Sequence, residues 1–123
     1  MIKKISLTAL LLAMMFSPVV SVYGEEIFGI QVYPGAKLDS ETTQFLKDSL
    51  HLNAAAYRTT DSVAKVTTFY KGQKGLAVVS EKKEGAMFMK GSYELTVTIQ
   101  NPWRNMKTGQ QMTDTLISIA KPK

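Results

Sequence analysis

The residue types that support catalysis are few in this chain, and none has the spacing of a known catalytic site. The single histidine, His51, stands alone in Leu50-His51-Leu52. It could act as the base of a Ser/His/Asp site, with Asp48 or Asp61 orienting the imidazole, but no nucleophile elbow is present. We favour a histidine at the exposed end of a helix and predict no catalytic residue. A hydrolase without a recognisable motif remains an alternative.

The carboxylates are scattered along the chain. Glu25 and Glu26 are adjacent, and Glu81 and Glu84 flank a pair of lysines. A glycosidase needs two carboxylates that face each other across a cleft, and no spacing here marks such a pair. We interpret these residues as a solvated surface.

Methionines are a second set with possible chemistry. Met87 and Met89 are two residues apart, which puts them on one face of a strand. Met106 and Met112 lie within the loop that follows. Thioether sulfurs suit Cu(I), so a Cu(I)-handling protein is another alternative. Methionine also fills gaps in cores. We favour that role and predict neither a metal site nor a cofactor.

The best candidate for recognition is the polar segment from Asn101 to Met112. Loops on a rigid sheet often carry binding residues, and tryptophan and arginine often anchor interfaces. We therefore predict binding through Trp103, Arg104, Met106 and Lys107, with Tyr70 as a further contact. The alternative is that Trp103 folds back and closes one end of the core.

A basic hairpin is predicted around Glu81-Lys82-Lys83-Glu84-Gly85, with Lys90 on the strand after it. Lys82 and Lys83 could contact an anionic lipid or polymer. The alternative is that these lysines protect the edge of a sheet from pairing with other strands.

Residues 1–24 have the layout of a secretory signal peptide. Lys3 and Lys4 precede an apolar run from Ile5 to Phe16, and small residues follow up to Gly24. The run is short of the roughly 20 residues that a spanning helix needs, so cleavage near Gly24 is favoured over an uncleaved anchor. The absence of cysteine excludes a lipid-modified cysteine and thiolate metal sites.

Cleavage also changes the charge. It removes two of the 15 basic and none of the 10 acidic residues, so the net charge falls from +5 to +3. A charge of this size does not indicate a nucleic-acid partner.

The elements that must position these residues follow from hydrophobic spacing. One helix is expected from Thr60 or Asp61 to Gly72, with Val63, Val66, Phe69 and Tyr70 on one side and with Val63, Val66 and Phe69 buried. A second is expected from Asp39 or Ser40 to Leu50, with Phe45, Leu46 and Leu50 on one face. Strands are predicted over residues 30–32, 54–59, 76–80, 86–90, 93–100 and 113–121.

This order predicts an α+β fold in a single domain, residues 25–123. We expect two layers: an antiparallel sheet of about four to six strands, with one face covered by one or two helices. Short connections predict that the last four strands form a meander.

Two segments resemble a pattern of small exported bacterial envelope proteins, whose roles are mostly uncharacterised. These segments are Tyr33-Pro34-Gly35-Ala36 and a strand and helix that contain Thr59-Thr60-Asp61-Ser62-Val63 and Phe69-Tyr70-Lys71. The resemblance spans roughly residues 30–100. It implies export and α+β architecture, and it implies no activity.

Together these features predict a periplasmic or secreted protein that is a non-enzymatic binding or accessory module of the cell envelope. The expected partner is an envelope protein or an anionic envelope component, and not nucleic acid. Membrane contact is expected only through the signal peptide during export. The oligomeric state stays open.

Overall fold

The computed structural model describes residues 25–123, so the predicted signal peptide lies outside the described residues. The chain divides after Pro34 into two compact units, which are described separately. In the first unit, β1 (Glu26–Ile27) pairs antiparallel with β2 (Ile30–Gln31). Phe28 and Gly29 have φ values of 54° and 81°, as a two-residue hairpin turn requires. The short strand predicted over residues 30–32 is present as β2, whereas its partner β1 was not predicted.

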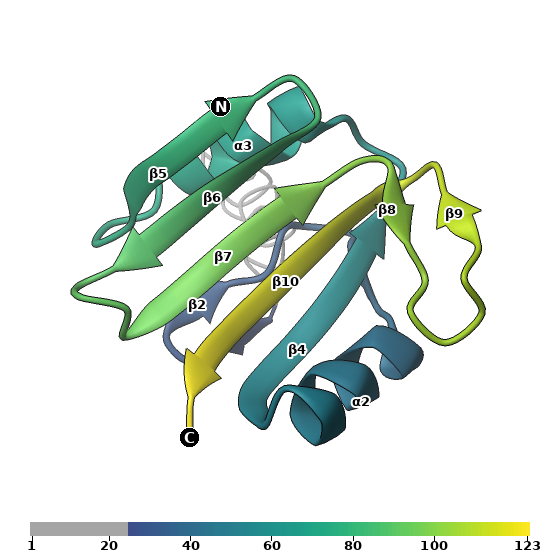
Figure 1. Cartoon of the computed structure of the whole chain (residues 1–123). Helices are drawn as coiled ribbons and strands as arrows, with labels where there is room; N and C mark the ends of the chain where they lie inside the picture. The colour runs from purple at the N-terminus through teal and green to yellow at the C-terminus, as the bar shows by residue number, and fades with distance from the viewer. Residues whose placement is uncertain (1–24) are drawn as a thin grey trace, which may run out of the picture. The chain divides into compact units, whose positions relative to one another are not determined.

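The second unit, residues 35–123, is built on a six-stranded antiparallel sheet in the order β3-β4-β10-β7-β6-β5 (Figure 1). Its strands are β3 (Lys37–Leu38), β4 (Leu52–Thr59), β5 (Ala77–Lys82), β6 (Gly85–Lys90), β7 (Leu95–Gln100) and β10 (Thr115–Pro122). The predicted α+β class, the antiparallel pairing and the meander of β5, β6, β7 and β10 are confirmed. β4 closes the arrangement by pairing with β10 along its whole length.

Helix α3 (Val63–Lys71) covers one face of the sheet, next to β6 and β7 (Figure 1). Val63 and Val66 are buried as predicted, whereas Phe69 is only partly buried. Tyr70, which was predicted to bind, is fully buried. Facing them are the fully buried side chains of the strands: Tyr57, Phe88, Val97, Ile99, Ile117 and Ile119. The rings of Tyr70 and Phe88 lie 6.2 Å apart between centroids. This apolar layer is the main core of the unit.

The start of α3 differs from the prediction. Ser62, not Thr60 or Asp61, is the N-cap, and its hydroxyl accepts from the Lys65 amide at 3.2 Å. Asp61 precedes the cap, and its own amide donates to the Thr59 hydroxyl. Three adjacent residues could all cap a helix, and local sequence does not choose among them.

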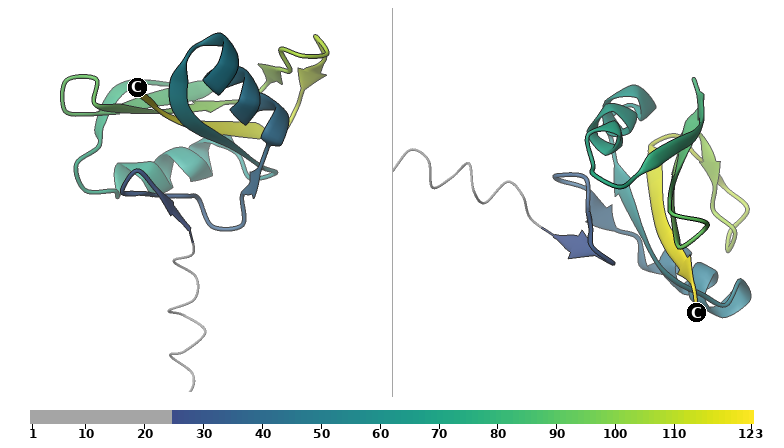
Figure 2. Two further views of the ribbon diagram at one scale, coloured as in Figure 1. Left: turned by 90° about the horizontal axis from the view of Figure 1, so that it is seen from below. Right: turned by 90° about the vertical axis from the view of Figure 1, so that its left-hand side faces the viewer.

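Helix α2 (Ser40–Ser49) lies against β4 on the other face of the sheet, as the left view of Figure 2 shows. Asp39 is its N-cap, in agreement with the prediction. Thr43 joins the helix to β4, because its hydroxyl accepts from the Ala56 amide at 2.9 Å. Leu46 packs on the sheet. Leu50, predicted to share that face, is instead 52% exposed at the helix end.

The strand predicted over residues 93–100 begins later, at Leu95. Leu95, Val97 and Ile99 alternate as buried residues, as expected. Alternation over the whole predicted strand would put Tyr93 on the same buried face, but Tyr93 is 70% exposed and has a φ of 63° in the turn after β6. A turn residue with positive φ does not continue the paired strand. The hydrophobic alternation therefore does not predict which side chains are buried before the strand begins.

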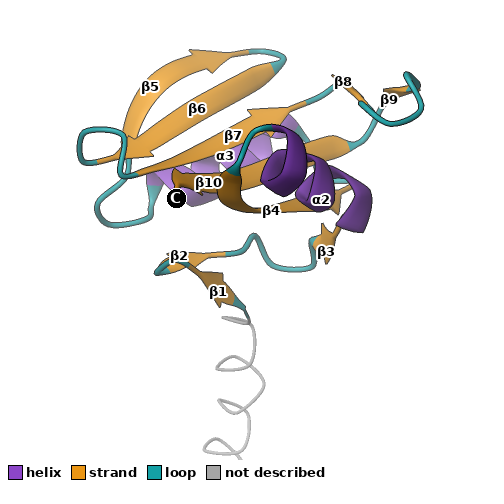
Figure 3. Ribbon diagram, turned by 60° about the horizontal axis from the view of Figure 1, so that its bottom comes forward, coloured by secondary structure: helices purple, strands orange, loops and turns teal. Residues whose placement is uncertain are grey.

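The segment predicted as a loop over residues 101–112 contains a small hairpin of β8 (Trp103–Arg104) and β9 (Gln111–Met112) (Figure 3). Asn105 organises its tip: its side-chain oxygen accepts from the amides of Lys107 and Thr108, at 2.9 and 3.1 Å. Within residues 25–123, no helix has the length and apolar character needed to span a bilayer.

Candidate functional site

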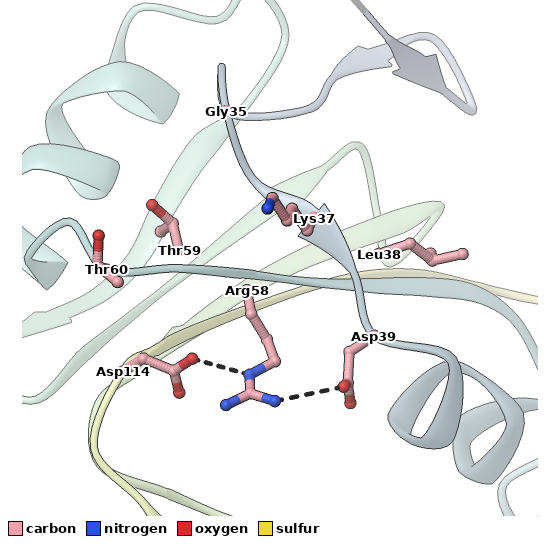
Figure 4. A pocket seen from close by; sticks show the side chains of 8 residues that line it. All are labelled: Gly35, Lys37, Leu38, Asp39, Arg58, Thr59, Thr60 and Asp114. Atoms are coloured by element: carbon pink, nitrogen blue, oxygen red, sulfur yellow. Dashed lines mark hydrogen bonds and ion pairs between the residues drawn. The ribbon is translucent and has the colours of Figure 1, made fainter.

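A polar hollow of about 450 Å³ lies where β3, the end of β4 and the turn before β10 meet (Figure 4). Its lining residues come from segments far apart in the chain: Gly35, Lys37, Leu38, Asp39, Arg58, Thr59, Thr60 and Asp114. Gly35 has a φ of 84°, which suits the predicted Pro34-Gly35 turn that leads into β3. We call this space the Arg58 hollow.

Arg58 is the centre of the hollow, and its guanidinium is fixed from several sides. Nε donates to Oδ2 of Asp114 at 2.8 Å, and Nη1 lies 3.7 Å from Oδ1 of Asp39 (Figure 4). The guanidinium carbon lies 5.3 Å from the centroid of the Trp103 ring, within the range of a cation–π contact. The indole Nε1 donates to the other oxygen of Asp114 at 2.9 Å. These contacts hold the charged group in one place.

The surroundings of Arg58 stabilise its charged form, and the two carboxylates beside it already accept hydrogen bonds or ion pairs. The hydrogen bond that Arg58 donates to Asp114 is the largest influence and raises the pKa of Arg58, and the negative charges of Asp114 and Asp39 act in the same direction. The second oxygen of Asp39 accepts from the amide and hydroxyl of Thr42. The oxygens of both carboxylates therefore already have partners within the protein.

The groups left for a ligand are mostly donors. The Arg58 side chain keeps 34% of its surface exposed, and Nη2 has no acceptor among residues 25–123. Lys37 and Thr60 are exposed along the same hollow. A guanidinium with its outer edge free pairs best with a carboxylate or phosphate oxygen. In the described part of the chain, no three His, Asp or Glu side chains are placed to hold a metal ion.

Two of the residues predicted to bind are buried. Trp103 is 5% exposed and packs with Ala56, Leu116, Leu46 and Met112. Its indole is therefore folded back into a small apolar cluster with Leu46 of α2, as the alternative expectation had it, although this cluster is separate from the main core under α3. Tyr70 is fully buried against Phe88. Neither side chain offers a surface to a partner, so we leave both out of the proposed site.

The remaining residues of the predicted Trp103 loop lie at the tip of the β8–β9 hairpin. Arg104 is exposed and donates from Nη1 to the Gly109 carbonyl at 2.6 Å. Met106 is 61% exposed. Lys107 lies 3.7 Å from Glu41 of α2. The structure brings these three together with Asn105, and it brings none of them into the Arg58 hollow.

Lys82 and Lys83 lie side by side at the turn between β5 and β6. They line a second polar hollow of about 400 Å³, together with Ser80, Met87, Thr98, Gln100 and their neighbours. Both ammonium groups lack a carboxylate partner within residues 25–123. Lys90 lies at the opposite end of β6 and does not share this hollow.

The structure also shows where the residues of the hydrolase alternative and of the Cu(I)-handling alternative lie. His51 is exposed in the turn between α2 and β4, with a φ of 55°. Met87 and Met89 share one face of β6, opposite Thr98 and Thr96 of β7, as their spacing predicts. Met112 instead packs with Trp103.

Sequence reasoning did not single out Arg58, Asp114 or Lys37 as site residues. One signal was available: Arg58 follows the apolar run Ala54-Ala55-Ala56-Tyr57 in a predicted strand, where a charge needs a partner. Its main partner, Asp114, is 56 residues away. No local pattern identifies a contact at that separation. No known family, no curated protein and no solved structure matches this chain at a significant level.

Proposed function

We propose that the chain is an exported, non-enzymatic binding module of the periplasm that recognises an acidic group of an envelope component at the Arg58 hollow. One observation carries the proposal. The Arg58 guanidinium is held from behind by Asp114, Asp39 and Trp103 while about a third of the side chain stays exposed in a hollow of about 450 Å³. A donor fixed before binding loses little side-chain entropy when a ligand arrives.

The chemistry of the ligand follows from the groups that remain available. The outer N–H groups of Arg58, the Lys37 ammonium and the Thr60 hydroxyl favour a ligand that supplies oxygen acceptors. Because Asp39 and Asp114 neutralise part of the local charge, we expect affinity for a single carboxylate or phosphate to be modest. A larger envelope molecule would gain further contacts along the hollow.

Export and scaffold belong to the same proposal. The signal-like residues 1–24 support export, and cleavage would leave a chain that begins at Glu25. We propose that the six-stranded sheet, with α3 over one face and α2 against β4 on the other, serves as the rigid frame of the site. The exposed tip residues Arg104, Met106 and Lys107 stay as a proposed secondary contact. Mass measurement of the periplasmic form tests the cleavage point.

The ligand site is tested by titrating the mature protein with inorganic phosphate and with acetate, following backbone amide shifts by NMR. We expect saturable shifts at Lys37, Thr59 and Thr60. Arg58→Lys should abolish saturation. A lysine ammonium cannot hold the Asp114 carboxylate and at the same time present a second edge of N–H donors to a ligand. Lys37→Gln should weaken binding several-fold without changing the fold.

Lys65→Gln is the matched control for Lys37→Gln, since it removes the same charge from an exposed lysine on α3, outside the hollow. It should leave the titration unchanged. Equal losses in Lys37→Gln and Lys65→Gln, or no saturable shift at the three reporter residues, would remove the hollow from the proposed function.

A further inference from the structure

The outermost strand β5 presents an unusual surface, independent of the Arg58 hollow. β5 is the edge strand of the sheet, and all six of its residues are exposed (Figure 1). Val78 and Val79 are 47% and 50% exposed at its middle. Two adjacent β-branched apolar side chains thus lie in solvent where the sheet has no further strand to cover them.

Cationic side chains lie at both ends of this strand. Lys82 and Lys83 are at the β5–β6 turn. Lys74 precedes β5, and Lys90 reaches the same end, since a Cβ on Gly75 would lie 4.0 Å from its Cε. None of these four lysines has a carboxylate partner within the described residues. β5 spans about 17 Å, so the two valines lie between lysines at its two ends.

Acidic residues near this edge only partly offset the lysines. Glu81 is engaged by Lys71 of α3, with the two charged atoms 2.8 Å apart. Glu84 lies in the β5–β6 turn, and Glu94 packs its carboxylate against Gly91 in the next turn. Four lysines without partners against these two carboxylates leave the edge positive.

Strand addition is the obvious use of an exposed edge, but the geometry disfavours it. The register between β5 and β6 shifts between Val78 and Ser80, so Val79 is an extra residue in a bulge. Bulges and edge lysines both hinder pairing with another strand. A lipid surface needs no backbone register. It can accept apolar side chains in the interface while lysines meet the phosphates.

We propose that the β5 edge docks on an anionic lipid bilayer, with Val78 and Val79 entering the interfacial region and Lys74, Lys82, Lys83 and Lys90 meeting the headgroup phosphates. This departs from the expectation that membrane contact ends with the signal peptide. It needs no occupant in the Arg58 hollow, so either proposal can fail alone.

Co-sedimentation with vesicles tests the proposal. The mature protein is mixed with vesicles of phosphatidylcholine alone, or of phosphatidylcholine with phosphatidylglycerol. We expect binding only to the anionic vesicles, weakened by salt. Each lysine is expected to contribute about fivefold to the partition coefficient, so Lys82→Gln with Lys83→Gln should weaken it about 25-fold.

The control variant, Lys47→Gln with Lys65→Gln, removes the same charge from the two helices, outside the β5 edge. It should change binding much less. Val78→Thr with Val79→Thr keeps shape and strand propensity, and should weaken vesicle binding while leaving the thermal midpoint unchanged. Circular dichroism melts of every variant separate lost binding from lost folding.

Three outcomes would overturn the proposal. The first is equal binding to neutral and anionic vesicles. The second is an equal loss in the edge and control lysine variants. The third is tight binding to soluble polyphosphate that the valine changes leave intact and that competes fully with vesicles, because a soluble polyanion would then be the partner.

Discussion

Asp114 is the residue whose removal most directly tests the Arg58 network. Its carboxylate accepts from the Arg58 guanidinium at 2.8 Å and from the Trp103 indole at 2.9 Å. Asp114→Ala removes the acceptor of the indole N–H of Trp103, a residue that is only 5% exposed. Leaving this buried donor unpaired costs about 1–3 kcal/mol. The ion pair adds no more than about 1 kcal/mol, because the Arg58 side chain is 34% exposed. The expected loss of unfolding free energy is therefore about 1–4 kcal/mol.

This loss is a large part of the roughly 5–15 kcal/mol that stabilises an ordinary domain. Urea unfolding of residues 25–123 measures it, and Trp103, the single tryptophan, reports directly on the network. Asp114→Asn keeps an acceptor for the indole and removes the charge, so it should cost only about 1 kcal/mol.

Asp48→Ala is the matched control. Asp48 lies on α2, is exposed and accepts only from Gln44 at 2.9 Å, so its removal should change stability by less than about 0.5 kcal/mol. The reasoning is refuted if Asp114→Ala costs no more than Asp48→Ala. It is also refuted if Asp114→Asn is as damaging as Asp114→Ala, because the indole hydrogen bond would then not be the main contribution.

Three further changes test the core and one tests pH dependence. Thr67→Val should stabilise by about 1 kcal/mol, since its 3% exposed hydroxyl has no partner within the described residues. Gly85→Ala should destabilise, because the new Cβ would lie 2.6 Å from the Ile99 carbonyl oxygen. Phe88→Ala should cost about 3–5 kcal/mol. Contacts with Asp114 and Asp39 raise the pKa of Arg58. The stability that these contacts give the folded protein is therefore present below the ordinary pKa of arginine and is lost only above the raised pKa. The cost of Arg58→Met should therefore stay constant from about pH 6 to about pH 9. Urea unfolding measures each effect.

Matched controls exist for two of these. Thr68→Val removes a hydroxyl that donates to the Ala64 carbonyl at 2.9 Å, so it should not stabilise. Gly72→Ala places a Cβ 3.4 Å from the nearest atom, in a backbone conformation that alanine adopts easily, and should be tolerated. A Thr67→Val protein no more stable than Thr68→Val would contradict the argument about the buried hydroxyl. Equal losses in the two glycine variants would contradict the close approach.

Much of the architecture follows from local sequence. The cap at Asp39, the apolar stripe of α3 and the alternation from Leu95 to Gln100 are short-range patterns, and each predicts its element without knowledge of the partner. The closely spaced turns after Gly72 predict the meander for the same reason. The errors fall where several local solutions compete, as at the cap of α3 and in the turn at Tyr93.

The candidate site could not be read in the same way. Trp103 looked like an exposed anchor because its neighbours are polar, yet the cluster with Ala56 and Leu116 buries it. Arg58 looked like an ordinary strand residue, yet it joins Asp39 and Asp114.

The sequence alone determined the helices, most strands and the basic character of the β5–β6 turn, because these depend on residues within one or two turns of each other. Tertiary structure decided which side chains are surface and which are core. It also decided that Asp39, Arg58, Trp103 and Asp114 meet, because pairing of β4 with β10 brings together segments that are 56 residues apart. That pairing depends on the whole sheet, and no short window of sequence contains it.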